Sequence, residues 1–171
     1  MVRVARFEKV SLRRFVADWI ATFPQQTVEQ AVAAYERIRL PERATSGSAG
    51  YDLFAPVGFE LGAGEGIKIP TGLRVLIEEG WVLTIYPRSG LGFKYRFQLD
   101  NSVGIIDSDY ARSDNEGHIF MCMTNDSREG KTLIVPSGTA FAQGVFLPFG
   151  ITVDDHAQGV RNGGLGSTTG H

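Results

Sequence analysis

The feature that most constrains the fold of this chain is a succession of short apolar runs that begins after about residue 38, where helical periodicity ends. These runs predict strands at residues 67–69, 73–77, 81–86, 119–123, 132–135 and 144–149. Gly, Pro, Asn and Asp separate the runs, as expected for strands joined by turns. Many short strands at such spacing are typical of antiparallel sandwiches and barrels. We therefore predict an all-β, jelly-roll-like antiparallel β-barrel over residues 39–158.

The first 38 residues follow a different pattern, which predicts a short N-terminal α-helical extension over residues 1–38. An apolar stripe at helical spacing follows Ser11, a residue that favours helix N-caps, and Pro24 ends this stripe. Thr27 and Gln30 have the spacing of a capping box before a second stripe. We predict helices at 11–22 and 27–38. Because both are amphipathic, they must pack on another surface, such as a sheet edge or a partner protein.

The composition argues against several classes of protein. Hydrophobic residues make up 43% of the 171, enough for a core, and no apolar run approaches the length of a membrane span. The chain has no basic-then-apolar leader, and its single cysteine, Cys122, cannot form an internal disulfide, so we expect a cytoplasmic protein. The formal net charge of −2 lacks the basic excess of most nucleic-acid binders. We expect neither a membrane nor nucleic acid as a partner.

A Gly-rich cluster at residues 87–92, P-R-S-G-L-G, directly follows the predicted strand 81–86. Arg88 offers a planar guanidinium that can bind an oxyanion through two hydrogen bonds, and Ser89 adds a hydroxyl. Gly90 allows backbone N–H groups to come close to such an anion. The cluster therefore suits a phosphate. A tight turn with an exposed arginine explains the same residues about equally well.

A second polar cluster, N-S-V-G-I-I-D-S-D-Y, occupies residues 101–110. On an extended segment Asp107 and Asp109 project to the same side, because side chains alternate along a strand. Asn101 can pair with a base edge through one donor and one acceptor, and the ring of Tyr110 offers a flat wall for a sugar. The simpler interpretation is a strand that runs into an Asp-rich turn.

Three further clusters carry little information singly. A-G-Y-D-L occupies residues 49–53, and Gln143 begins an apolar strand, where a glutamine usually only satisfies backbone groups. The segment 159–171 holds five glycines and almost no apolar side chains, which predicts a mobile Gly-rich tail. Its hydroxyls and its arginine could close over a polyphosphate, although a disordered terminus explains the same composition.

The order of the five clusters is more specific than any one of them. A-G-Y-D-L, P-R-S-G-L-G, N-S-V-G-I-I-D-S-D-Y, A-Q and R-x-G-G-x-G-S-T-x-G closely resemble the five motifs of the homotrimeric dUTPase (dUTP diphosphatase) family, over residues 38–170. The resemblance implies a jelly-roll subunit, a homotrimer with active sites at the subunit interfaces, and hydrolysis of dUTP to dUMP and pyrophosphate with Mg²⁺.

The resemblance also implies roles for individual residues. Asp107 would activate the water that attacks the α-phosphate, and Gln143 would help to hold that water. The phosphate contacts would be Arg88, Ser89, Gly90, Arg161, Gly166, Ser167 and Thr168. The base and sugar contacts would be Asn101, Gly104, Ile105, Ile106, Tyr110 and Leu165. Mg²⁺ would be bound mainly by the triphosphate and water, with Asp52 contacting it through water at most, and a purely structural role for this carboxylate is an equal alternative.

Several positions depart from the family pattern. Leu165 replaces a stacking aromatic residue, residues 111–116 stand where the pattern has about one residue, and Ala140 stands where an arginine is common. His118 stands alone and is interpreted as structural. A dCTP deaminase, or a bifunctional deaminase–diphosphatase, would need a further glutamate, for which Glu116 is the nearby candidate. A regulatory binding protein on the same scaffold would use the N-terminal helices and the longer hairpin.

Overall fold

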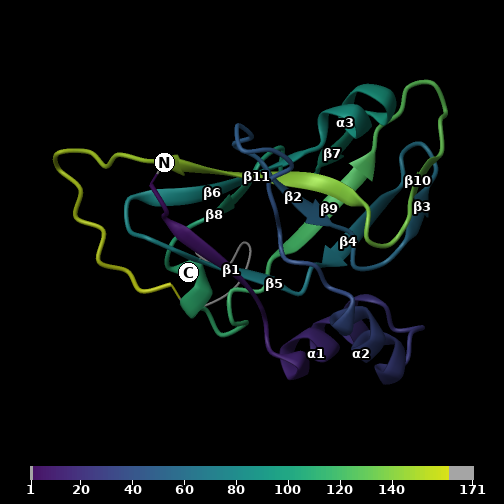
Figure 1. Ribbon diagram of the computed structural model, residues 1–171, viewed down its shortest axis with the longest axis horizontal. Helices are drawn as coiled ribbons and strands as arrows, with labels where there is room; N and C mark the ends of the chain where they lie inside the picture. Colours follow the sequence, from purple (N-terminus) through teal and green to yellow (C-terminus); the bar gives the residue numbers. More distant parts are fainter. Residues whose placement is uncertain (1, 162–171) are drawn as a thin grey trace.

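A four-stranded antiparallel sheet forms one layer of the barrel. The computed structural model describes residues 2–161, and in it β2 (Tyr51–Phe54), β11 (Ala140–Pro148), β6 (Trp81–Pro87) and β8 (Gly104–Ile106) lie side by side in that order (Figure 1). The register aligns Gln143 of β11 with Asp52 on one side and Tyr86 on the other. A β-bulge between Ala140 and Ala142 interrupts the pairing with β2. The long strand β11 therefore aligns residues from three distant parts of the chain.

Three smaller antiparallel sheets complete the barrel. One contains β4 (Gly66–Pro70), β9 (Phe120–Asn125) and β7 (Phe97–Leu99), in that order. The other two are the pairs β1 (Ala5–Lys9) with β5 (Leu73–Ile77), and β3 (Phe59–Leu61) with β10 (Leu133–Val135). This architecture confirms the predicted all-β, jelly-roll-like fold and each of the six predicted strands.

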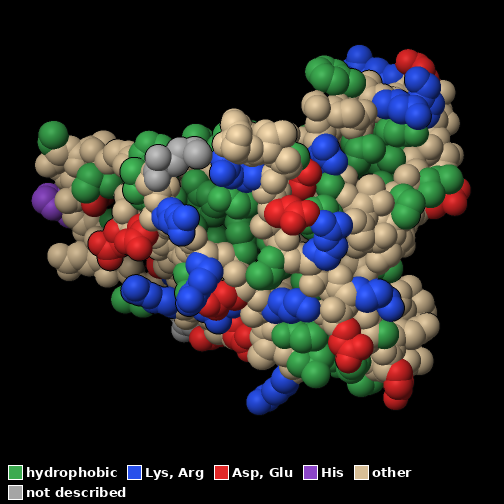
Figure 2. Space-filling view, viewed as in Figure 1, with side chains coloured by type: hydrophobic (Ala, Val, Ile, Leu, Met, Phe, Trp, Pro, Cys, Tyr) green, Lys and Arg blue, Asp and Glu red, His purple; other side chains and the backbone are tan. Residues whose placement is uncertain are grey.

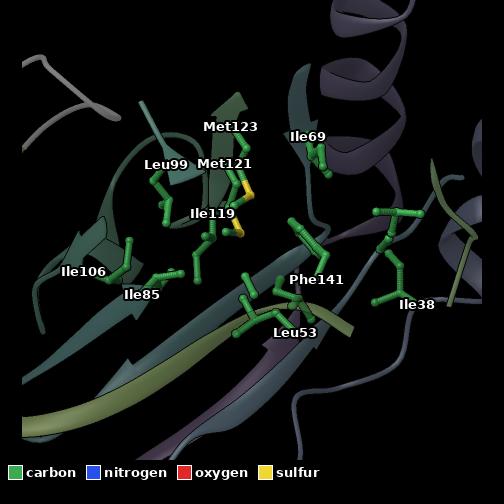
Figure 3. Packing of buried hydrophobic residues seen from close by; sticks show 14 of the residues in the cluster. Ile38, Leu53, Ile69, Ile85, Leu99, Ile106, Ile119, Met121, Met123 and Phe141 are labelled. Atoms are coloured by element: carbon green, nitrogen blue, oxygen red, sulfur yellow. The ribbon is translucent and has the colours of Figure 1, made fainter. Parts of the chain in front are cut away.

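The core lies between the sheets and is built from the inward side of each strand. Strands β7, β8 and β10 each alternate buried, exposed and buried residues, as the two-residue period of a strand requires. Figure 3 shows how Leu53 and Phe141 from one layer meet Ile69 and the methionines of β9 from the other. These buried apolar side chains hold the two layers together.

Two helices pack beside the barrel and largely match their prediction. Helix α1 (Leu12–Thr22) is capped by Ser11, whose hydroxyl accepts a hydrogen bond from the Arg14 backbone N–H at 3.1 Å. Helix α2 (Val28–Glu36) begins with the predicted capping box of Thr27 and Gln30 and ends two residues earlier than expected. Phe15 and Trp19 on the apolar stripe of α1 are at most 1% exposed, so the stripe packs on the barrel.

The N-terminal segment, for which helices at 11–22 and 27–38 were predicted, also contains a strand before its first helix. Strand β1 precedes α1 and pairs with β5 in register, Ala5 opposite Ile77 and Lys9 opposite Leu73. Ala5 and Phe7 alternate with Arg6 and Glu8, but this alternation spans only four residues directly before the helical stripe that follows Ser11. The N-terminal segment therefore contributes to a sheet as well as to the helical layer.

The surface shows no concentration of one charge on the face drawn in Figure 2. Lys and Arg side chains lie among Asp and Glu side chains across that face. Among residues 2–161, no helix combines the length and the apolar composition needed to cross a bilayer.

Candidate active site

One polar cluster lies where β2, β11 and β6 run side by side. The Arg88 Nε lies 3.5 Å from Asp52 Oδ1, and the Gln143 side-chain amide donates a hydrogen bond to the Pro87 carbonyl at 3.3 Å. The side chain of Arg88 is 44% exposed and that of Asp52 is 20% exposed. The guanidinium is therefore oriented by a neighbouring carboxylate while one side of it remains open to a ligand.

Gly50 makes this arrangement possible, a role that the sequence did not reveal. A Cβ at this position would lie 2.7 Å from the Gln143 Oε1, closer than real contacts of a Cβ. A larger residue would displace the glutamine side chain. The close approach of Gln143 therefore accounts for a glycine at position 50. Gln143 lies 93 residues later in the chain, and the pairing of β2 with β11 brings it close to Gly50.

The P-R-S-G-L-G cluster is the start of a short helix rather than a loop. Arg88 is the N-cap of α3 (Ser89–Tyr95), and Ser89 and Gly90 are exposed in its first turn. No atom lies within 4 Å of a Cβ built at Gly90, so the packing of this chain does not require a glycine there. Backbone N–H groups in the first turn of a helix lack intrahelical acceptors, and this suits an oxyanion.

A second polar cluster contains both carboxylates of the D-S-D segment. Arg161 forms an ion pair with Asp107 through Nη2, and its Nε donates a hydrogen bond to Asp109 Oδ1 at 2.9 Å. The guanidinium carbon also lies 5.9 Å from the ring centre of Tyr110, within cation–π range. The two carboxylates therefore converge as predicted. The backbone is not extended, however, because a turn and a 3-10 helix (Tyr110–Arg112) follow β8.

Tyr110 is almost fully buried, at 3% exposed. Its hydroxyl donates a hydrogen bond to the His118 carbonyl at 2.8 Å and accepts one from the Asn115 side chain at 3.1 Å. Burial raises the pKa of the Tyr110 phenol, so the hydroxyl remains a donor at neutral pH. These contacts hold the ring in one orientation beside Arg161.

A small cavity adjoins the turn that contains Asn101. Its volume is about 190 Å³, and its lining residues are Ile85, Leu99, Asp100, Asn101, Gly104, Ile106, Phe120, Met121 and Cys122. Ile105 does not line it and is 51% exposed. Residues 100–103 connect β7 and β8, which belong to different sheets. The cavity has room for a base rather than a whole nucleotide, since drug-sized ligand pockets are larger.

The two polar clusters lie toward opposite ends of β6. Ile106, the residue before Asp107, pairs with Leu83, and β8 runs antiparallel to β6. Arg88 follows Leu83 by five residues, which corresponds to about 17 Å along a strand. Within one chain, the predicted phosphate contact Arg88 and the predicted catalytic carboxylate Asp107 therefore lie far from each other. The predicted contacts Leu165, Gly166, Ser167 and Thr168 lie outside the described residues.

The donor groups favour a metal held by substrate over a metal held by protein. Within residues 2–161, no three His, Cys, Asp or Glu side chains are grouped as ligands of one ion. Asp52 is a single carboxylate beside the Arg88 guanidinium. A hydrated Mg²⁺ bound mainly by phosphate oxygens fits this donor set, because Mg²⁺ retains water and needs few carboxylates.

Glu116, the residue considered for deaminase chemistry, instead binds Ser11 at the start of α1. Its carboxylate accepts hydrogen bonds of 2.7 Å from both the backbone N–H and the hydroxyl of Ser11. Burial by itself would raise the pKa of Glu116, but the hydrogen bonds from Ser11 outweigh this effect and the pKa is lowered. An ionised carboxylate that holds a helix cap is poorly suited to proton transfer at a base.

Comparison with known proteins identifies the family. The family model described as dUTPase matches residues 36–169. The deoxyuridine 5'-triphosphate nucleotidohydrolase of Lactococcus lactis subsp. lactis is 43% identical over 134 residues, covering 77% of this chain and 88% of the relative. That of Tolumonas auensis is 41% identical over 140 residues, again covering 77% and 88%.

Solved structures agree in fold. The crystal structure of the Streptococcus mutans dUTPase aligns with a TM-score of 0.61 at 34% identity, covering 85% of this chain and 97% of that chain. A Staphylococcus bacteriophage 80α dUTPase aligns with a TM-score of 0.63 at 18% identity, covering 92% and 98%. With both motif clusters in place on this fold, the chain belongs to the dUTPase family of dUTP diphosphatases.

Proposed function

We propose that this chain hydrolyses dUTP to dUMP and pyrophosphate in a Mg²⁺-dependent reaction, in which Asp107 activates the attacking water. The observation that carries the proposal is the half-exposed Asp107 carboxylate, which shares the Arg161 guanidinium with Asp109. A carboxylate can orient a water molecule and accept its proton. Family membership supports dUTP as the substrate.

The bond changes centre on the α-phosphorus. The water oxygen bonds to this phosphorus, the bond from it to the oxygen bridging to the β-phosphate breaks, and pyrophosphate leaves with the electron pair. Asp107 takes the proton of the water. Phosphoryl transfer depends mainly on positioning and charge neutralisation, so the remaining residues act by binding.

The Arg88 cluster supplies the phosphate contacts. Asp52 beside the guanidinium orients it, and Ser89 and Gly90 at the start of α3 offer a hydroxyl and backbone N–H groups. Gln143 lies one strand away and is available to the α-phosphate and its water. When bound with substrate, Mg²⁺ would neutralise phosphate charge, and Asp52 would contact it through water at most.

The cavity beside Asn101 is proposed to bind uracil. Asn101, Gly104 and Ile106 line this cavity. By resemblance to the family, the Asn101 side chain and the backbone of Gly104, Ile105 and Ile106 would pair with the base, and Tyr110 would pack on the deoxyribose. Cytosine would leave groups of such a pocket unpaired, which disfavours dCTP. At the tail, Arg161, Gly166, Ser167 and Thr168 would contact phosphates while Leu165 covers the base.

We also propose that each active site is shared between chains of a homotrimer. The separation of the Arg88 and Asp107 clusters along β6 supports this, because a second copy can bring its own Arg88 cluster to Asp107. Enzymes of the dUTPase family are homotrimers and depend on divalent metals. A phage φ11 dUTPase of 20% identity was described with a structural Mg(II) ion.

The test compares pyrophosphate release from dUTP, dCTP, dTTP and UTP, with Mg²⁺ and with chelator. We expect rapid release from dUTP alone and its loss with chelator. The Asp107→Asn variant should lose most turnover while it still binds dUTP. Parental turnover by this variant would exclude Asp107 as the base, and ammonia release from dCTP would favour a deaminase.

A further inference from the structure

Two of the segments in which this chain departs from the family pattern lie against each other. Helix α1 precedes the region matched by the family model, and residues 113–118, which follow the 3-10 helix Tyr110–Arg112, form a loop here termed the insertion loop. Ser11 at the start of α1 donates two hydrogen bonds of 2.7 Å to Glu116 of this loop. Further along α1, Asp18 Oδ2 lies 2.6 Å from His118 Nδ1. The helix therefore contacts the loop at two polar points.

The hydrogen bonds around His118 define its tautomer. The Gly72 backbone N–H donates to Nε2 at 2.8 Å, so Nε2 is the unprotonated nitrogen and Nδ1–H donates to Asp18. Arg14 pairs with the same carboxylate, with Nε 2.9 Å from Oδ2. The His118 side chain is fully buried, and burial lowers its pKa, which keeps the ring neutral. The imidazole is therefore held from both sides, by α1 and by the turn before β5.

The backbone of the same residue holds Tyr110. The His118 carbonyl accepts the hydrogen bond of the tyrosine hydroxyl, and Asn115 of the insertion loop donates to that hydroxyl. Gly117 packs tightly on the 3-10 helix, where a Cβ would lie 2.5 Å from the Ala111 Cα. A displacement of His118 would therefore be transmitted to the Tyr110 hydroxyl through one hydrogen bond.

We propose that Asp18 and His118 are positioning residues that hold Tyr110 in place for the sugar of the nucleotide. This inference rests on the proposed role of Tyr110 in dUTP binding. Through these two residues, α1 contributes to the selectivity for deoxyribose over ribose. A looser Tyr110 would contact the deoxyribose less well and leave more room for a 2′-hydroxyl.

The hydrogen bond between Asp18 and His118 is better suited to fixing the orientation of His118 than to adding stability alone. The attraction of a buried carboxylate to its partners is largely offset by the cost of its desolvation, so such a contact adds little net stability. Phe15 and Trp19 already give α1 a fully buried apolar contact with the barrel. Asp18 and His118 add directional hydrogen bonds, which fix an orientation that apolar packing leaves less defined.

The experiment measures kcat and KM for dUTP and for UTP in wild type, Asp18→Ala, Asp18→Asn and the control Glu36→Ala. Glu36 is an exposed acid at the end of α2, and its loss should change nothing. For Asp18→Ala we expect the dUTP-to-UTP ratio of kcat/KM to fall about tenfold, mainly through a higher KM for dUTP. Asp18→Asn keeps an acceptor for His118 Nδ1–H and should recover most of the ratio.

A double-mutant cycle with Tyr110→Phe tests whether Asp18 affects selectivity through the Tyr110 hydroxyl. If Asp18 acts through the tyrosine hydroxyl, Asp18→Ala should have little further effect on the ratio once that hydroxyl is absent. Equal effects of Asp18→Ala in both backgrounds would overturn the proposal, as would an unchanged ratio in the wild-type background.

A second variant covers the case in which Asp18→Ala does not fold. Ser11→Ala removes one exposed hydrogen bond to Glu116 together with the N-cap hydrogen bond from the Arg14 backbone N–H, and it should lower the ratio about threefold with no effect in the Tyr110→Phe background. A folded Ser11→Ala variant with wild-type selectivity would then overturn the proposal. A wild type that does not hydrolyse dUTP would instead refute the proposed function and this inference with it.

Discussion

Replacement of Gly117 by alanine tests the close packing of the insertion loop on the 3-10 helix. Gly117 has a φ of +71°, and a Cβ there would lie 2.5 Å from the Ala111 Cα and 2.9 Å from the Tyr110 carbonyl oxygen. The left-handed backbone alone costs an alanine about 1 kcal/mol. Contact with backbone atoms that cannot rotate away adds about 2 kcal/mol of overpacking. We expect Gly117→Ala to lower the free energy of unfolding by about 3 kcal/mol.

Gly80 provides a matched control. Its φ is +80°, but no atom lies within 4 Å of the position that a Cβ would take, so Gly80→Ala should cost only the backbone term of about 1 kcal/mol. For a chain of this size, 1 kcal/mol corresponds to about 3 °C in Tm, which predicts shifts of about 9 °C and 3 °C. Both are measured by thermal unfolding at one protein concentration, because assembly makes Tm concentration-dependent. Equal shifts for the two variants would refute the close packing at Gly117.

The other predictions concern a titrating histidine, the phosphate contacts and the C-terminal segment. The lowered pKa of His118 means that the folded chain binds fewer protons than the unfolded chain just below pH 6.5. Tm should therefore fall as the pH is lowered from 7.5 to 5.5, and His118→Asn, which cannot titrate there, should show a flatter profile. Arg88→Lys should raise the KM for dUTP about tenfold through loss of bidentate geometry, and calorimetry should find Tm almost unchanged because the pair with Asp52 is partly exposed. Deletion of residues 160–171, which removes Arg161, should lower dUTP turnover at least about tenfold in the pyrophosphate assay. A deletion variant with a greatly reduced Tm would contradict the view that this segment serves catalysis rather than folding.

Much of the fold was predictable because its signals are local. The six predicted strands carry their own apolar runs, and both helices carry caps within a few residues of their start. Strand β8 has only three residues and lies inside the polar cluster 101–110, and the alternation of β1 spans only four residues, Ala5 to Glu8. Strand β8 forms by pairing with β6, and β1 forms by pairing with β5. Pairing with a distant strand produces no pattern in the local sequence.

The sequence indicated candidate site residues but not the contacts between them. The order of the motifs and the resemblance to dUTPases indicated Arg88 and Asp107. Asp107 and Asp109 do converge on Arg161, but through a turn and a 3-10 helix rather than through the extended backbone that the two-residue spacing assumed. The contact of Asp52 with Arg88 depends on β2, β11 and β6 lying in that order, which is a property of the sheet. The role of His118 could be foreseen only as structural, because its partner Asp18 lies 100 residues earlier.

That separation has a consequence for the order in which the chain folds during synthesis. Helix α1 leaves the ribosome early, but the imidazole that its carboxylate binds is added 100 residues later. At about 5–20 residues per second this interval lasts about 5–20 s. Throughout it, Phe15 and Trp19 have no completed barrel to cover them, so the nascent chain exposes an aromatic surface of the kind that chaperones bind. Helix α1 is made before the barrel and is therefore among the last of the described elements to reach its native environment.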